Sequence, residues 1–311
     1  MVRPYDFGFN PETALDNEFQ HPTELPPEEV IAQAQAEFDA MVKHLQNHQI
    51  EILVLDLEMP QNTPDALFPN NWFSTAPDGS LTIYPMKTEN RRREVKLAEL
   101  LRLLKSSDYE VSDIHDLRPE SVDWPDESIL EGTGSLVFHH DKRLAFAAIS
   151  ERCQRTALQS FCERFDYEMV AFDTKTLNGS AIYHTNVVMS IGERISVICT
   201  EVIPESQRAT VIEQLKCCSE EVIEITESQM AEHFCGNILQ VRNTEGKPVF
   251  IMSASTHAGF TPEQKRILES YGQLLACDIS LIESIGGGSA RCMLAENFLK
   301  HMKRLDKEGA I

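Results

Sequence analysis

The sequence lacks several features that would assign it to a common class. None of its eight cysteines stands in a C-x-x-C pair, so they indicate neither a zinc site nor a disulfide framework. No apolar run approaches the roughly 20 residues that span a bilayer, and the first residues lack the basic-then-apolar order of a secretion signal. No G-x-G-x-x-G fingerprint follows the first expected strand, which argues against a doubly wound nucleotide-binding sheet. We therefore expect a cytoplasmic protein that carries no metal and no cofactor.

Basic side chains are also scarce. The chain has 28 Lys and Arg against 49 Asp and Glu, a formal net charge of -21. Such a surface repels polyanions, which argues against nucleic acid and anionic membranes as partners and leaves small cationic or zwitterionic molecules. At 311 residues the chain is long enough for one large α/β domain, and we expect a single domain over residues 1–311. Nothing in the sequence decides between a monomer and a homo-oligomer.

A pattern repeats along most of the chain after a first amphipathic helix, expected over residues 28–48. Each copy has a strand-like run, a polar or glycine-rich tip, an apolar hairpin and an amphipathic helix. The tips recur about every 52 to 60 residues, which indicates a repeat architecture whose tips meet at one axis in a closed ring. The five tips are PNNW at 69–72, LEGTG at 130–134, YHTN at 183–186, FCGN at 234–237 and GGGSARC at 286–292.

The last copy holds the candidate nucleophile. Its expected elements are a strand over 278–284, the glycine run 286–288, and a helix after Cys292. A thiol just before a helix feels the positive end of the helix dipole, which would lower its pKa and raise the thiolate fraction. The alternative interpretation is a buried cysteine beside an ordinary glycine turn.

The tips together form a candidate catalytic set. They supply Asn70, Asn71, Glu131, His184, Asn186, Asn237 and Cys292. Histidine is the side chain with a free pKa closest to neutrality, so it suits a thiol that must exchange a proton. A carboxylate and several amides can hydrogen-bond a planar, nitrogen-rich group, which favours a guanidino or ureido carbon over a peptide carbonyl. Singly, each residue could equally be structural.

The motifs LEGTGSLVF, YHTNVVMSIG and IGGGSARCM resemble the Glu, His and Cys motifs of the guanidino-group-modifying superfamily, which includes arginine deiminases and dimethylarginine dimethylaminohydrolases. The tip PNNW, the HTN motif and the ending ARCMLAE are most similar to its citrulline ureidase-like or arginine dihydrolase-like branch. The resemblance covers essentially the whole chain. It implies a pentein fold, an α/β propeller of five ββαβ-type repeats.

The resemblance also implies roles. Cys292 would attack the guanidino carbon, His184 would shuttle protons, and Glu131 would hold the planar nitrogens and orient His184. Arg152, in the Ser-x-Arg context of residues 150–152, would bind the substrate carboxylate, with Arg92 as a second candidate that could equally begin a solvated helix.

Two positions depart from the deiminase pattern. Asn71 and Asn186 stand where deiminases have substrate-holding aspartates. A site that loses two negative charges should prefer a cationic guanidinium less and tolerate a neutral ureido group better. We therefore expect a hydrolase of an arginine-like amino acid that continues past deimination to ornithine, carbon dioxide and ammonia. The alternatives are plain deimination, dimethylarginine hydrolysis, an amidinotransferase, a non-catalytic amino-acid-binding module and a structural repeat protein.

Overall fold

Four small sheets of identical topology form most of the molecule. The computed structural model describes residues 1–58, 62–121 and 124–302. Each sheet has three strands, and its order follows the sequence. The sheets are β1 (Phe73–Thr75), β2 (Ser80–Ile83) and β3 (Asp113–Asp116); β4 (Val137–His139), β5 (Leu144–Ala148) and β6 (Glu168–Phe172); β7 (Met189–Ile191), β8 (Ile195–Ile198) and β9 (Glu221–Glu224); and β10 (Leu239–Arg242), β11 (Pro248–Ser253) and β12 (Gln273–Cys277).

Within each sheet the first two strands form an antiparallel hairpin and the third pairs parallel to the second. In the second sheet, for example, Val137 lies opposite Phe146, and Phe146 lies beside Val170. A parallel third strand requires a crossover connection, and a helix provides it in every sheet. The chain is therefore a series of ββαβ units, as the repeat pattern predicts.

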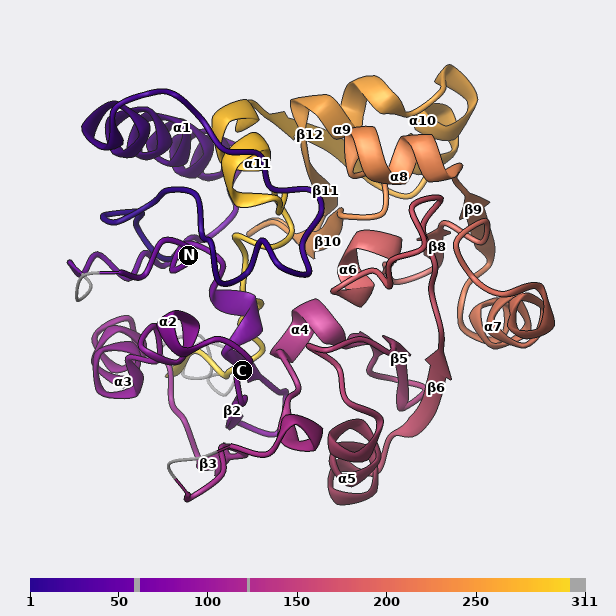
Figure 1. Ribbon diagram of the computed structural model, residues 1–311, viewed down its shortest axis with the longest axis horizontal. Helices are drawn as coiled ribbons and strands as arrows, with labels where there is room; N and C mark the ends of the chain where they lie inside the picture. Colours follow the sequence, from indigo (N-terminus) through magenta and orange to yellow (C-terminus); the bar gives the residue numbers. More distant parts are fainter. Residues whose placement is uncertain (59–61, 122–123, 303–311) are drawn as a thin grey trace, which may run out of the picture.

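The crossover helices lie around the rim of the molecule (Figure 1). They are α2 (Glu89–Arg92) and α3 (Leu97–Ser106) in the first unit, α5 (Arg155–Phe165) in the second, α7 (Glu205–Cys218) in the third, and α9 (Ala254–Gly259) and α10 (Pro262–Glu269) in the fourth. Helix α10 begins with the capping box expected from its sequence, in which Thr261 and Gln264 satisfy each other's backbone N–H groups. The sequence did not predict the break between α2 and α3, nor α8 (Glu227–His233).

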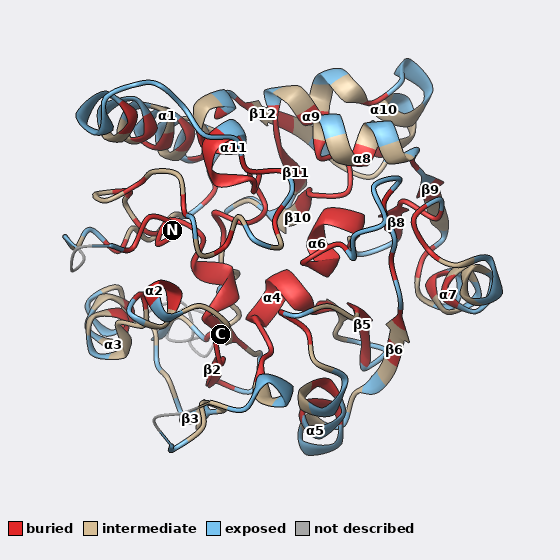
Figure 2. Ribbon diagram, in the orientation of Figure 1, coloured by how far each residue is buried: buried red, intermediate tan, exposed pale blue. Residues whose placement is uncertain are grey.

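The tips of the units are short, buried turns of helix near the centre of the molecule. They are η1 (Pro69–Asn71), α4 (Gly132–Ser135) and α6 (Thr185–Val188), and each directly precedes the first strand of a sheet. Helix α4 contacts both η1 and α6. Figure 2 shows α4 and α6 buried, whereas the outer faces of α5 and α7 are exposed. These three tips therefore lie close together in space, as inferred from the sequence.

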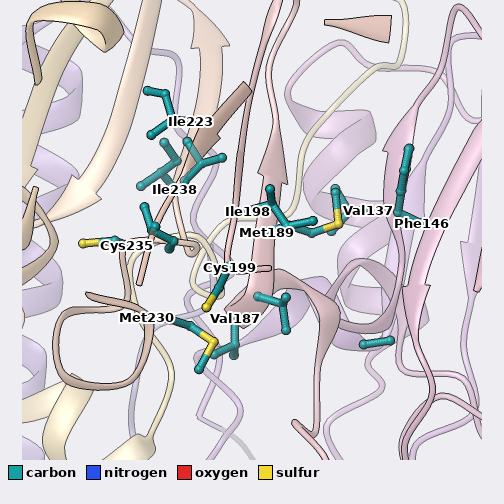
Figure 3. Packing of buried hydrophobic residues seen from close by; sticks show 14 of the residues in the cluster. Val137, Phe146, Val187, Met189, Ile198, Cys199, Ile223, Met230, Cys235 and Ile238 are labelled. Carbon is teal, nitrogen blue, oxygen red and sulfur yellow. The ribbon is translucent and has the colours of Figure 1, made fainter. Parts of the chain in front are cut away.

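Apolar side chains hold neighbouring units together. One core cluster joins the second, third and fourth sheets and includes Phe146, Met189, Ile198, Ile223 and Ile238. Figure 3 shows these side chains among those of the cluster. Contact of β7 with both β4 and β10 completes this packing. Burial of apolar surface, which is not directional, stabilises the association of the units. The polar residues of the tips are therefore not needed to hold the units together and are available for a chemical role.

The N-terminal residues, helix α1 and the segment around Leu55 pack beside the first and fourth units. Helix α1 (Pro27–Asn47), predicted over residues 28–48, connects two extended segments that run parallel. Their bridge joins Val2 and Leu55, and the N–H of Leu55 donates to the carbonyl of Met1 at 2.8 Å. The order of these segments, with the one at Val2 followed by α1 and the one at Leu55, matches the second strand, the helix and the third strand of a regular unit. In the described residues, however, this part forms no three-stranded sheet.

Two expectations for the last copy are wrong. Residues 280–286 form helix α11 (Ser280–Gly286), and the strand is β12, which comes earlier. The isoleucines of this segment bury one face against α1 at helical spacing, so the apolar residues that suggested a strand belong to a helix. No helix begins after Cys292 within residues 293–300, and the rest of the expected terminal helix lies mostly outside the described residues.

Candidate active site

The tips enclose one small hollow beneath the N-terminal segment. Its lining residues are Asn17, Asp65, Phe68, Asn71, Arg91, Arg152, Tyr183, His184, Gly286, Gly288 and Cys292. Its volume is about 10 Å³, the space of roughly one water molecule. Of the residues expected from the sequence, Cys292, His184, Asn71 and Arg152 line it directly. Charged and nucleophilic groups from several units are thus gathered at one site, to which the N-terminal segment adds the amide of Asn17.

Glu131 and His184 form a buried pair beside this hollow. Glu131 precedes α4 and His184 precedes α6, so the packing of the two tips brings their side chains together. Nε2 of His184 lies 2.8 Å from Oε2 of Glu131, and Oε1 accepts the backbone N–H of Lys87 at 2.9 Å. Two guanidinium groups flank the carboxylate, with Arg152 at 3.8 Å and Arg91 at 3.9 Å.

The surroundings determine the charge of both partners. Burial disfavours the ionised form of Glu131, but Arg152, His184 and Arg91 outweigh it and lower its pKa to about 2. Burial lowers the pKa of His184 to about 4, although its bond to Glu131 acts in the opposite direction. At neutral pH the pair is therefore a carboxylate and a neutral imidazole. Since an ionised carboxylate only accepts, we assign the imidazole proton to Nε2, which leaves Nδ1 as a base.

Cys292 is a buried thiol held by amides, not a thiol at a helix start. Its N–H donates to the carbonyl of Ser289 at 2.9 Å in a turn that follows α11. The Nδ2 groups of Asn237 and Asn186 lie 3.3 and 3.5 Å from Sγ. Burial outweighs these donors and raises the pKa of Cys292 above its ordinary value. The expected lowering of this pKa by a helix dipole is therefore wrong for the unliganded site.

Asn71 faces the imidazole across a glycine. Oδ1 of Asn71 accepts from Nη1 of Arg91 at 2.7 Å, while Nδ2 has no hydrogen-bond partner in the described structure. A Cβ atom on Gly134 would lie 2.2 Å from Nδ2 of Asn71 and 2.8 Å from Nδ1 and Cε1 of His184. Gly134 is thus required because a side chain there would fill the space between the amide and the ring. A buried amide without a partner is costly, which favours a ligand acceptor at this position.

The two arginine candidates lie in different places. Arg152 is buried at the hollow, where Nε donates to Asp16 at 3.0 Å and its guanidinium lies over the ring of Tyr183. Arg92 points away from the hollow. Its Nε donates to the carbonyl of Met86, and its guanidinium lies 4.2 Å from the ring centroid of Trp124.

Sequence reasoning missed two buried charged residues of the hollow. Arg91 pairs with Glu94 at 3.0 Å and donates to Asn71, although its neighbour Arg92 was the candidate in the NRRRE run. Asp65 accepts from Asn10 and Thr13 through Oδ2, and its buried Oδ1 has no partner among the residues described. Asp65 could have been noticed in the sequence, because it is an acidic residue only four positions before Pro69, where the first tip begins.

A much larger cavity lies among the first strands and the segments at the chain ends. It has a volume of about 870 Å³, and apolar side chains such as Leu53, Leu104, Val241 and Phe298 make up much of its lining. It shares none of its residues with the small hollow. In the described ranges, no three His, Cys, Asp or Glu side chains lie close enough together to hold a metal ion.

Comparison with known proteins agrees with the motifs. Residues 3–299 match the model of the family described as N,N dimethylarginine dimethylhydrolase, eukaryotic. The chain belongs to this family. It is therefore a member of the guanidino-group-modifying superfamily. No curated protein sequence matches the chain. None of the helices in the described part is long and apolar enough to cross a membrane.

Solved structures share the fold at low sequence identity. The N-terminal domain of ArgZ, an arginine dihydrolase from cyanobacteria, was solved bound to substrate; it is 13% identical, with a TM-score of 0.66 over 94% of this chain and 95% of that one. A dimethylarginine dimethylaminohydrolase adduct is 15% identical, with a TM-score of 0.59 over 85% and 90% of the two chains. The present chain covers only 39% of the longer ArgZ chain, so it corresponds in extent to one part of that protein.

Proposed function

We propose that the protein is a cysteine hydrolase of guanidino or ureido C–N bonds in an arginine-like amino acid. The observation that carries this proposal is the convergence of the Cys292 thiol with the His184–Glu131 pair on one enclosed hollow. A nucleophile, a base and a group that orients the base are the parts that covalent catalysis requires. Membership of a family described by dimethylarginine hydrolysis supports the same reaction class.

The geometry supports a definite sequence of proton movements. Nδ1 of His184 accepts the thiol proton as Sγ attacks the guanidino or ureido carbon, and the ionised Glu131 stabilises the imidazolium that forms. The tetrahedral adduct expels ammonia or an amine, which takes that proton. Water then attacks the covalent intermediate, His184 accepts a proton from it, and the thiol is released. The amides of Asn186 and Asn237 stabilise the sulfur while it carries negative charge.

The charges of the hollow favour an amino acid whose reacting group carries little positive charge. Asn71 and Asn186 are neutral where deiminases place carboxylates, and the unpartnered Nδ2 of Asn71 can donate to a ureido oxygen. This supports citrulline as a substrate or intermediate, and hydrolysis that continues to ornithine. Arg152 remains our candidate for the substrate carboxylate. Arg92 is the weaker candidate, because its guanidinium is bonded to backbone carbonyls away from the hollow.

Two further functions fit the same residues. An amidinotransferase would form the same covalent intermediate and resolve it with an amine instead of water. A binding module would hold the amino acid without turnover, but the intact set of Cys292, His184 and Glu131 favours an enzyme.

We also propose that the 311 residues form one five-bladed propeller domain. The fifth blade would combine the segment after Cys292 with the N-terminal strand, α1 and the segment near Leu55. The parallel bridge between Val2 and Leu55 supports this assignment.

The decisive experiment is to incubate the protein with arginine, citrulline, agmatine or dimethylarginine and to identify the products by mass. We expect ornithine from arginine and from citrulline without an added amine acceptor. Accumulation of citrulline from arginine would show that the two asparagines do not have the proposed effect. Turnover that depends on an added amine would indicate a transferase, and no turnover of any compound would indicate a binding module.

A further inference from the structure

The N-terminal segment closes the hollow. Residues 10–21, here called the strap, run near the centre of the molecule (Figure 1), and Asn17 of the strap lines the hollow. Nδ2 of Asn17 donates to the carbonyl of Gly287 at 3.2 Å, and Nε2 of Gln20 donates to that of Gly286 at 3.0 Å. The strap is thus bonded to the glycine run that carries Cys292. Since the hollow has room for about one water, an amino acid can bind only if part of its lining moves, and the strap contributes Asn17 to that lining.

One charged residue of the strap binds the cation that a substrate carboxylate would need. Oδ1 of Asp16 accepts from Nε and Nη2 of Arg152, and its Oδ2 accepts from Nζ of Lys87 at 2.7 Å. Nη2 of Arg152 also donates to the carbonyl of Thr13, another strap residue, at 3.0 Å. The Asp16 side chain is only 15% exposed, so these charge-assisted bonds are largely shielded from solvent.

The local charges explain why Asp16 is ionised. Burial raises the pKa of Asp16, but Arg152 and Lys87 outweigh it and lower the pKa below its ordinary value. Lys87 has a second carboxylate partner in the exposed Glu151. The remaining polar contacts of the strap with the glycine run are neutral hydrogen bonds, which are weaker. The bonds of Asp16 are therefore among the charge-assisted bonds that hold the strap closed, together with those that Asn10 and Thr13 donate to the carboxylate of Asp65.

We propose that Asp16 is a latch that occupies the substrate-carboxylate position in the empty enzyme. When a substrate arrives, its own carboxylate takes the place of Asp16 at Arg152, so the strap opens without leaving a buried guanidinium unpaired. Asp16 thereby selects ligands that carry a carboxylate. This inference rests on the proposed function for the identity of the ligand, but the closure itself can be tested without turnover.

The test is the alkylation rate of Cys292 by iodoacetamide, followed by mass spectrometry of the peptide that contains it. Replacing Asp16 with Asn should speed alkylation about tenfold, the effect of losing one charge-assisted bond on an opening equilibrium. The exposed Cys217 provides an internal control whose rate should not change. Glu18→Gln is the matched control, because Glu18 lies in the same strap and is exposed.

A second variant separates opening from electrostatics. Asp16→Asn removes a negative charge and could speed alkylation by lowering the thiol pKa. Lys87→Met removes a positive charge, so electrostatics alone would slow alkylation, whereas a broken latch would speed it. Faster alkylation in both variants supports the latch. Faster alkylation in Asp16→Asn alone, or in neither variant, overturns it.

Steady-state kinetics then distinguish the latch from the proposed function. In Asp16→Asn, we expect KM for citrulline or arginine to fall while kcat changes less, because an internal competitor for Arg152 is gone. A higher KM would mean that Asp16 binds the substrate directly, which would overturn displacement. If the wild-type protein turns over none of these compounds and alkylation is still accelerated in both variants, the proposed function fails and the latch remains.

Discussion

Two cavities of this protein differ both in volume and in the kinds of side chain that line them. The large one, of about 870 Å³, lies among the first strands and is lined mainly by apolar and exposed polar side chains. The small one, of about 10 Å³, gathers a thiol, an imidazole, a carboxylate and two guanidinium groups, all buried. The larger volume therefore does not coincide with this group of buried charged and nucleophilic side chains.

The difference teaches what a buried charge indicates. Taking ionised groups out of water is costly, so a fold that buries several of them at one point must compensate with pairing or use them in function. Here the pairing is incomplete, because amide and carboxylate atoms of Asn71, Asn186 and Asp65 have no partner in the described structure. We therefore assign chemistry to the small hollow. Its small volume agrees with the proposed closure by the strap.

The largest expected effect comes from removing the nucleophile. Cys292→Ala should lower kcat by at least about a thousandfold, since covalent catalysis is lost while the rest of the site remains. Calorimetry with citrulline should still detect binding. Cys235→Ala, which removes another buried thiol outside the hollow, is the matched control and should remain active. Retained turnover in Cys292→Ala would break the assignment of chemistry to the small hollow.

Removing the charge of Glu131 should have the next largest effect. Glu131→Gln should lower kcat about a hundredfold, because a positioned general base contributes on this scale and loses its orienting partner. The bond to Glu131 raises the pKa of His184 against the effect of burial, so its loss should lower that pKa below about 4. Wild-type activity should be lost as pH falls through about 4, where His184 becomes protonated. The acid limb of the variant should therefore lie at lower pH, and a shift to higher pH would contradict this pairing.

A charge introduced at Asn71 tests the electrostatics of substrate choice. Asn71→Asp places a carboxylate beside Arg91 and opposite His184, where it should favour a cationic guanidinium over a neutral ureido group. We expect the ratio of kcat/KM for arginine to that for citrulline to rise about tenfold, with citrulline accumulating from arginine. Asn47→Asp adds the same charge at the exposed end of α1 and should leave the ratio unchanged. An unchanged ratio in Asn71→Asp would show that this residue does not determine the choice between arginine and citrulline.

The pH dependence of alkylation tests the state of the thiol. Because burial raises the pKa of Cys292, its alkylation rate in the unliganded wild type should keep rising as pH increases beyond the ordinary thiol range. The rate is followed from pH 6 to about 10 on the Cys292 peptide, with Cys217 as an exposed reference. An alkylation rate that stops rising near neutral pH would show that Cys292 has the low pKa that the sequence predicted.

The smallest effect is expected in the large cavity. Val241→Phe adds bulk on β10, which lines that cavity and shares no residue with the hollow. We expect kcat/KM to stay within about twofold, as for substitutions away from a functional site. A change comparable to that of Glu131→Gln would show that the two cavities are coupled.

The spacing of tips and apolar runs was sufficient to predict the repeated unit and most of its helices. Local signals carried this information: apolar residues at helical spacing predicted α1, and Thr261, Pro262 and Gln264 marked the start of α10. The tips that share this phase of the repeat bring Glu131 next to His184, and His184 lines the same hollow as Cys292. The last copy was predicted less well, because residues 278–284 are apolar enough for a strand but belong to α11.

By itself, the sequence determined which side chains are available for chemistry and at what interval they recur, because repeat length and residue type are properties of the chain. Only the tertiary structure decided how far those side chains are buried and which charged groups lie beside them. It buried Cys292 and so raised its pKa, it turned Arg91 inward and Arg92 outward, and it placed Asp16 against Arg152 across 136 residues of sequence. The physical reason is that desolvation and charge pairing depend on which distant groups come within a few ångströms, and local sequence patterns do not encode those distances.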